Sequence, residues 1–209
     1  MLATLTLSDF LSRVADKEPV PGGGSVAALS GAVASSLTRM VANLTLGKKN
    51  YEAHQELMKQ IVQRAKDEEQ RFTADIDRDA DAYRALFACF GLPKETDEEK
   101  AARSRAIQAA TQTAALVPME VARRACALMP LIAQVATLGN RNAVTDACVA
   151  MMSARSAVLG ALLNVRINLS GIKDEAFASA LRTEADQLER QACACEEQLL
   201  TQVHQELGV

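Results

Sequence analysis

Apolar residues recur at helical spacing along nearly the whole chain, whereas the alternation of branched and polar residues that marks strands is almost absent. Between residues 57 and 90, apolar side chains return at intervals of three, four and seven positions, and residues 177–203 repeat this spacing. Residues spaced in this way share one face of a helix. The pattern therefore predicts an all-α protein, and a length of 209 residues suits a single domain over residues 1–209.

Prolines, glycines and polar linkers divide the chain into a bundle of long helices. A short first helix falls within residues 4–16, and Thr96 with Glu99 has the spacing of a capping box. We expect Pro118 to bend or divide the third long helix and Pro130 to open a separate short one. The other expected helical segments are residues 26–46, 52–90, 97–129, 131–138, 147–169 and 174–206.

The segment from Pro19 to Tyr51 is the one around which we expect the other helices to pack. It begins with a glycine triplet and Ser25, a candidate N-cap whose hydroxyl can accept from an amide of the first turn. The helix that follows is rich in Ala, Ser and Gly, so another backbone can approach it closely. A glycine loop before a helix is a ready anion site. It is also a common structural turn, and no P-loop or dinucleotide-binding fingerprint is present.

Composition narrows the class of protein further. Charges of both signs are interspersed to a net charge of −3 and only 3% of residues are aromatic, so we expect no nucleic-acid partner. Arg39 and Arg155 interrupt the most apolar stretches, which favours buried helices over membrane spans. Five cysteines and two histidines fit neither a disulfide framework nor a metal site. Together with the absence of a signal-peptide pattern, they indicate a cytoplasmic protein with reduced thiols.

The helix expected over residues 147–169 is apolar nearly all round. Such a helix must be covered on every face, either by its own domain or by a second subunit. It also carries polar residues that need partners wherever they are buried, namely Arg155, Asn164, Arg166 and Asn168.

Four acidic residues fall in the middle of the second long helix. At about 100° per residue, Asp79 lies roughly 60° from Ile76 and borders the apolar stripe. Asp75 is a weaker candidate on the same side, and Asp77 and Asp81 are expected to face water. An acidic run is equally explained as a solvated helix face. The pattern makes Asp79 a candidate for chemistry without deciding its role.

Two polar segments between apolar helices offer further candidates. Lys48 and Lys49 end the small-residue helix, where cations are also favourable at the negative end of the helix dipole. In the later segment, Asn142 or Thr145 can cap the next helix and Asp146 falls in its first turn, which again suits the dipole. A short amide-rich loop can equally bring hydrogen-bonding groups into a buried cleft.

Four motif blocks occur together in one order. They are PVPGGGSVAALSGAVASSLTRMVANLTLGKKNYE at residues 19–52, DADAY at 79–83 with its Leu92-Pro93-Lys94 exit, GNRNAVTDACV at 139–149 and GALLNVRINL at 160–169. This order resembles the cyclodeaminase/cyclohydrolase family of folate enzymes and covers essentially the whole chain. The resemblance implies an all-α bundle assembled as a homodimer, with the folate site near the subunit interface. It implies no metal and no redox cofactor.

The resemblance implies one of two reactions on a tetrahydrofolate substrate. A cyclohydrolase adds water to 5,10-methenyl-tetrahydrofolate and gives 10-formyl-tetrahydrofolate. A cyclodeaminase closes 5-formimino-tetrahydrofolate to the methenyl compound and releases ammonia. Both need an anion near the cationic amidinium, a proton carrier and an activated nucleophile. We expect the cyclohydrolase, because the chain contains no formiminotransferase half.

Mapped onto this sequence, the resemblance gives Lys48 and Asp146 as the catalytic pair and Asp79 as a second carboxylate. Lys48 is preferred to Lys49, although the sequence does not order them. The residues expected to line the pocket or bind the substrate are Gly22, Gly23, Gly24, Ser25, Asn43, Lys49, Tyr51, Asn140, Asn142, Arg166 and Asn168.

Two other classes of protein would keep the same bundle. A non-catalytic folate-binding or scaffold protein would bind reduced folate and leave its methenyl group unchanged. A helical interaction module would dock a partner helix on the long amphipathic helix at residues 174–206 and would not bind folate.

Overall fold

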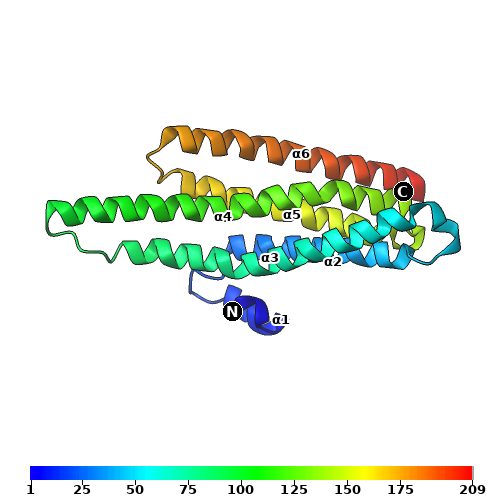
Figure 1. The fold of residues 1–209 in the computed structure, drawn as a ribbon, viewed down its shortest axis with the longest axis horizontal. Coiled ribbons are helices and arrows are strands. Elements are labelled where there is room, and N and C mark those ends of the chain that lie inside the picture. The colour runs from blue at the N-terminus through cyan, green and yellow to red at the C-terminus, as the bar shows by residue number, and fades with distance from the viewer. Residues whose placement is uncertain (209) are drawn as a thin grey trace.

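The computed structural model of the protein describes residues 1–208, which contain six α-helices and no strand (Figure 1). The predicted all-α class is confirmed. The α-helices are α1 (Leu7–Val14), α2 (Gly23–Thr45), α3 (Gln55–Cys89), α4 (Asp97–Leu138), α5 (Val144–Leu169) and α6 (Glu175–Leu207). Three short 3-10 helices connect or precede them: η1 (Leu2–Thr4), η2 (Lys49–His54) and η3 (Arg141–Ala143).

Helices α2, α3, α4 and α5 form an up-and-down bundle in which each helix packs against two neighbours. Helix α6 packs on α4 and α5, and α1 lies apart near the N-terminus (Figure 1). Helices α3 and α4 extend past the bundle as a two-helix arm, at the left of Figure 1. The glycine loop before α2 lies on the side of this arm. The loops 46–54 and 139–143 lie at the opposite end of the bundle.

Helix α2 is buried along much of its length, as its small side chains predict. A Cβ at Gly31 would lie 2.6 Å from Cδ1 of Phe72, so only glycine lets α3 come this close. The helix begins at Gly23 and has Gly22 as its N-cap. The predicted N-cap role of Ser25 is therefore wrong. Ser25 lies inside the first turn and is fully buried, and its hydroxyl donates to α3 instead.

Helix α4 is continuous over 42 residues and contains both Pro118 and Pro130. The prediction of a separate helix opening at Pro130 is wrong. Each proline removes a backbone N–H donor, but α4 packs along α3, α5 and α6, and this tertiary burial outweighs the local loss. The predicted capping box is confirmed: Thr96 accepts from the Glu99 amide, and the Glu99 carboxylate accepts from the Thr96 amide.

Helix α5 begins directly after η3, with Ala143 at its N-cap and no side-chain cap. Neither Asn142 nor Thr145 caps it, because the Asn140 side chain accepts from the Asn142 amide and caps the η3 turn instead. The single chain also leaves one face of this apolar helix uncovered. The exposed apolar side chains of α5 are Val149, Met152, Leu163 and Ile167.

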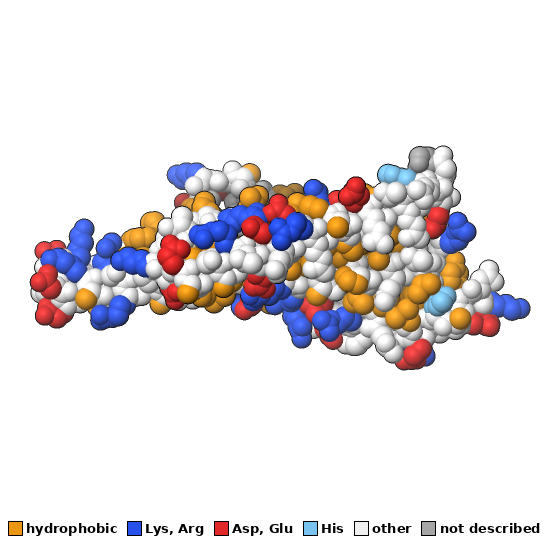
Figure 2. Space-filling view, turned by 90° about the horizontal axis from the view of Figure 1, so that it is seen from above, with side chains coloured by type: hydrophobic (Ala, Val, Ile, Leu, Met, Phe, Trp, Pro, Cys, Tyr) orange, Lys and Arg blue, Asp and Glu red, His pale blue; other side chains and the backbone are white. Residues whose placement is uncertain are grey.

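The surface carries charges of both signs side by side, without a large patch of one sign on the face that Figure 2 shows. By length and composition alone, three helical segments are apolar enough to cross a membrane: residues 23–45, 97–138 and 141–169. Between 50% and 56% of each apolar window is buried inside the bundle. The remaining residues of each window are partly or fully exposed in the single chain.

Candidate active site

A cleft of about 280 Å³ lies where the glycine loop meets α3, α4 and α5. The glycine loop contributes residues 19–24, apart from Pro21, and α3 contributes Asp79, Ala82 and Tyr83. Ala114 of α4 and three residues of α5, Asn164, Ile167 and Asn168, complete the lining. Segments that are far apart in the sequence therefore meet at one concave site, and three of the four motif blocks contribute residues to it.

Asp79 is the carboxylate that lines this cleft. The Ser25 hydroxyl lies 3.1 Å from its Oδ2 and 2.9 Å from the Ile76 carbonyl oxygen, and can donate to either. Burial raises the pKa of the Asp79 carboxyl above its ordinary value, and the hydroxyl and backbone N–H of Ser25 oppose this shift. Within residues 1–208 no cation pairs with it. Such a carboxylate is suited to face a cationic centre and to accept a proton.

The glycine triplet allows the backbone to approach two side chains of the cleft. A Cβ at Gly24 would overlap the Asp79 carboxylate, and one at Gly23 would lie 3.3 Å from Nδ2 of Asn164. The first turn of α2 thus lies directly against the carboxylate, with no side chain between them. These positions are therefore glycines because the backbone of α2 lies close to the side chains of Asp79 and Asn164.

Two asparagines of α5 line the cleft one helical turn apart. The amide of Asn168 donates to the carbonyl oxygens of Ala114 (3.1 Å) and Asn164 (2.8 Å), and that of Asn164 donates to the Gly160 carbonyl (2.8 Å). The sequence analysis assigned Asn168 to the site and named Asn164 only as a polar residue that needs a partner. The missed signal was spacing, because residues four positions apart share a helix face.

Lys48, Lys49 and Asp146 lie at the other end of the bundle. Lys48 follows the C-terminus of α2, Lys49 begins η2, and Asp146 lies in the first turn of α5. Both lysines are exposed. This end also holds Tyr51 and the loop that contains Asn140. None of the described residues of this end lines the cleft beside Asp79.

The loops at this end are tied together by hydrogen bonds. The Asn140 amide donates to Oγ1 of Thr45 (2.8 Å), and the Arg141 amide donates to the Tyr51 hydroxyl (3.1 Å). Gln55 accepts from the Gly47 amide (2.8 Å), which fixes the turn before Lys48. The structure therefore holds the lysine loop and the loop before Asp146 in one place.

The two groups of predicted site residues are separated by the length of α2, about 33 Å for 23 residues at 1.5 Å per residue. Asp79, the glycines, Ser25 and Asn168 lie at one end. The other end holds Lys48, Lys49, Tyr51, Asn140, Asn142 and Asp146. Exposed Asn43 lies on α2 near this second end.

Arg166 lies away from both groups. Its guanidinium pairs with Asp186 (2.8 Å) and Glu189 (2.5 Å) of α6, so in the single chain it joins α5 to α6. Its predicted contact with the substrate stays a prediction.

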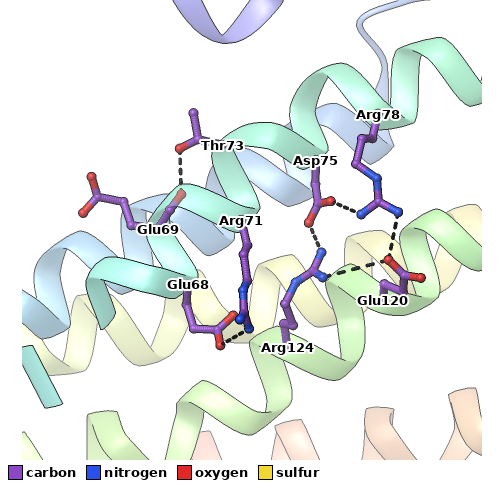
Figure 3. Close-up of polar contacts among 8 residues, drawn as sticks. All are labelled: Glu68, Glu69, Arg71, Thr73, Asp75, Arg78, Glu120 and Arg124. Atoms are coloured by element: carbon purple, nitrogen blue, oxygen red, sulfur yellow. Dashed lines mark hydrogen bonds and ion pairs between the residues drawn. The ribbon is translucent and has the colours of Figure 1, made fainter. Parts of the chain in front are cut away.

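Asp75 lies one helical turn from Asp79 and has a different environment. It is 1% exposed and accepts from Arg78 at 2.6 Å and from Arg124 of α4 (Figure 3). Arg78 also pairs with Glu120 (3.0 Å), which links α3 to α4. Asp75 is therefore a buried structural charge. Figure 3 shows that this network lies between the two helices.

The other two acids of the run also differ. Asp77 accepts from the amides of Leu2 (2.5 Å) and Ala3 (3.3 Å), so the expectation that it faces water is wrong, because it holds the N-terminal segment. Asp81 is exposed and pairs with Arg84, as expected for a solvated position. Within residues 1–208 no group of three or more His, Cys, Asp or Glu side chains is arranged to hold a metal ion.

The geometry defines a class of helical bundle with a carboxylate in a glycine-lined cleft, and comparison with known proteins narrows this class. A sequence profile described as formiminotransferase-cyclodeaminase matches residues 6–187. A methenyltetrahydrofolate cyclohydrolase from Methylorubrum extorquens is 40% identical over 199 residues, which are 95% of this chain and 96% of that protein. The chain belongs to the formiminotransferase-cyclodeaminase family, as its motifs predict.

Two further relatives match the chain, one by sequence and one by structure. A formimidoyltransferase-cyclodeaminase from Sus scrofa is 32% identical over 186 residues, which are 89% of this chain and 34% of that longer protein. The crystal structure of a formiminotetrahydrofolate cyclodeaminase from Thermotoga maritima matches with a TM-score of 0.88 at 29% identity. That match covers 99% of this chain and 100% of the other. The predicted bundle is thus seen in a solved relative.

Proposed function

We propose that this protein hydrolyses 5,10-methenyl-tetrahydrofolate to 10-formyl-tetrahydrofolate. The observation that carries the proposal is Asp79, a carboxylate of raised pKa without a cation of its own, in a glycine-lined cleft. The similarity to the M. extorquens cyclohydrolase, 40% over nearly both full lengths, supports the reaction class. The cytoplasmic location stays a prediction.

The reaction needs a negative group beside a positively charged carbon. Water oxygen bonds to the methenyl carbon, and the proton that water loses passes to a base. This gives a neutral hydroxy intermediate. Its hydroxyl group then loses its proton as the C=O bond forms and the bond from this carbon to N5 breaks. N5 takes a proton, and the formyl group remains on N10. Asp79 would lie against the cationic carbon and accept the water proton. Lys48 is proposed to return a proton to N5, and Asp146 to hold the lysine in place.

The exposed apolar faces of α2 and α5 support a homodimer. On α2 the exposed apolar residues follow heptad-like intervals of seven, seven and four. They are Val26, Val33, Met40 and Leu44, and α2 packs beside α5, which exposes the four apolar side chains given above. An apolar surface of this extent on two adjacent helices is typical of a subunit interface.

Light scattering after gel filtration, in the absence of detergent, tests this interface. We expect a dimer for the natural protein and a monomer for Val33→Glu, which buries a charge in the interface. Leu11→Glu on α1 is the matched control, because Leu11 is 54% exposed and lies outside α2 and α5. A monomeric natural protein, or a dimeric Val33→Glu, would refute the interface.

A dimer of this kind also accounts for the separation of the predicted site residues. A two-fold axis across the middle of α2 would place the N-terminus of one α2 against the C-terminus of its counterpart. Asp79 of one subunit would then meet Lys48 and Asp146 of the other. We propose that each cleft is completed in this way across the interface, so that two sites form per dimer.

Absorbance of the methenyl group tests the reaction directly. In a stopped-flow assay with 5,10-methenyl-tetrahydrofolate, in a buffer where spontaneous hydrolysis is slow, a cyclohydrolase removes the methenyl band rapidly. A folded dimer that binds the compound and leaves the band unchanged would be a folate-binding protein and would contradict the proposal. A folded protein without folate affinity would be a helical interaction module.

The second candidate function is cyclisation of 5-formimino-tetrahydrofolate with release of ammonia. The structural match to the Thermotoga maritima cyclodeaminase favours it. The same instrument separates the two reactions, because this activity makes the methenyl band appear when the formimino compound is supplied. Appearance of the band with ammonia, and no hydrolysis in the first assay, would establish the cyclodeaminase.

A further inference from the structure

Helix α3 continues beyond Asp79 as a strip of exposed aromatic rings. Tyr83, Phe87 and Phe90 are 39%, 66% and 51% exposed. The chain contains five Phe, two Tyr and no Trp, so nearly half of its aromatic residues lie on this one strip. Aromatic side chains are among those that gain most from burial, so their gathering in the open requires an explanation.

The strip borders a second cavity that adjoins the Asp79 cleft. This cavity has a volume of about 340 Å³. It is lined by residues 18–20 of the loop before α2 and by Tyr83, Arg84, Phe87 and Ala88 of α3. Pro19, Val20 and Tyr83 line both cavities. The two spaces therefore share a wall and lie side by side.

The rings have the geometry of a stacking surface. The centroids of Tyr83 and Phe87 are 6.3 Å apart and their planes differ by only 13°. Phe90 is turned by 71° relative to Phe87 and is not part of the cavity wall. Two nearly parallel rings thus form the wall of the second cavity, and the third ring lies outside it.

The charges of this cavity suit an uncharged ring. The Arg84 guanidinium pairs with Asp81 at 2.9 Å, so its charge is balanced, and Glu18 contributes a negative charge to the opposite wall. No basic cluster lines the cavity to attract an anionic group. The stacking surface is consequently the strongest recognition feature of the cavity.

We propose that Tyr83 and Phe87 form the subsite for the aminobenzoyl ring of the folate substrate. This inference rests on the proposed function. In that substrate the reacting carbon is bonded to N10, and N10 is bonded directly to the benzoyl ring. Along α3, Tyr83 lies about 6 Å from Asp79 and Phe87 about 12 Å, at 1.5 Å per residue. The order of groups in the substrate thus matches the order of residues on the helix.

The first test measures binding of p-aminobenzoylglutamate, which contains the ring and lacks the reacting carbon, by calorimetry or ligand-observed NMR. We expect Phe87→Ala to weaken binding by about 3- to 10-fold, the effect of one lost aromatic contact. Phe90→Ala is the matched control and should leave the affinity unchanged, because Phe90 lies outside the cavity wall. Equal affinities of both variants, or no binding to the natural protein, would overturn the proposal.

The second test uses turnover of 5,10-methenyl-tetrahydrofolate by the same variants. A ring that stacks equally in the ground state and the transition state changes KM and leaves kcat nearly constant. Phe87→Ala should therefore raise KM, and Phe87→Leu should raise it less, because leucine restores only part of the lost contact. A fall in kcat at constant KM would overturn the subsite.

The two proposals fail in different ways. Fragment binding that depends on Phe87, without turnover, would refute the hydrolase and retain the ring subsite. Turnover that is indifferent to Phe87 would refute the subsite alone. If Phe87→Ala and Phe90→Ala both convert the dimer to monomers in gel filtration, the strip is an interface between copies, and the subsite is overturned.

Discussion

The two ends of α2 hold the two parts of the predicted site, and they differ physically. At the N-terminal end, Asp79 lies in a cleft, and burial raises the pKa of its carboxyl. At the C-terminal end, Lys48 and Lys49 are exposed on a loop fixed by hydrogen bonds. One end is shaped to receive a substrate, and the other presents cations outward. The difference suggests that each end is half of a site.

The largest effect should follow from changing Asp79. Asp79→Asn removes the anion and base, and we expect kcat to fall by about 10²- to 10⁴-fold in the stopped-flow assay. Asp81→Asn, on the same helix but exposed, is the matched control and should retain normal turnover. Normal turnover of a folded Asp79→Asn would remove the cleft from the mechanism.

Asp79→Asn should not destabilise the fold. The folded-state pKa of Asp79 is raised above its ordinary value, so the ionised carboxylate opposes folding at pH values above that folded pKa. The variant should therefore withstand as much urea as the natural protein, or more, near neutral pH. This difference should shrink as the pH falls below the folded pKa and vanish below the ordinary pKa of an unfolded carboxyl. Lower stability at neutral pH would contradict this assignment.

Changes at the opposite end should be nearly as large. Lys48→Met should lower kcat by about 10²-fold, because the proton carrier is lost, and Asp146→Asn should have an effect of the same order. Lys59→Met is the control, since Lys59 is an exposed lysine of α3 paired with Glu56. If Lys48→Met and Asp146→Asn both fold and turn over normally, the proposed pair is wrong. A larger effect for Lys49→Met would reverse the order of the two lysines.

A smaller effect should follow from a single methyl group beside the carboxylate. A Cβ at Gly24 would overlap Asp79, so Gly24→Ala must displace the carboxylate or the first turn of α2. We expect kcat/KM to fall by about 10-fold, since misplacing a reacting group by a fraction of an ångström is costly. Gly91→Ala is the control, because its Cβ would make only an ordinary contact at 3.5 Å. Equal activity of the two variants would show that the approach of Gly24 is unimportant.

The smallest effect is a shift in the pH dependence. The Ser25 hydroxyl favours the ionised form of Asp79, so Ser25→Ala should raise the pKa of that carboxyl further. Because the carboxylate is the active form, the rate should be lost at a higher pH as the solution is acidified. The acid limb of the kcat/KM profile measures this shift. A limb that stays in place or moves to lower pH would exclude Asp79 as the titrating base.

Periodicity predicted much of the fold and one end of the site. The stripe on α3 fixed which side of that helix faces the bundle, and Asp79 could be identified at its edge. Ser25 was assigned the wrong role because its hydrogen bond to Ile76 joins residues 51 positions apart, which no local rule describes. Pro130 was expected to begin a helix, since tertiary packing that tolerates a proline does not show in the sequence.

The distance between the two ends could not be predicted in the same way. The motif order predicts which residues form the site, but not how far apart one chain holds them. The sequence also could not distinguish the roles of Asp75 and Asp79. Asp75 is a structural charge because it pairs with Arg78 and Arg124, and these contacts appear only in the structure. The exposed faces of α2 and α5, and not the motifs, suggest how the ends meet.

Subunit complementation is the most direct test of a site that is completed across the interface. Asp79→Asn and Lys48→Met subunits, carrying different affinity tags, are coexpressed, and the heterodimer is purified through both tags. One of its two sites then contains both substitutions and the other contains neither, so we predict about half of the natural activity, against almost none for either parent. A heterodimer as inactive as its parents would contradict the account and show that each subunit contains its own site.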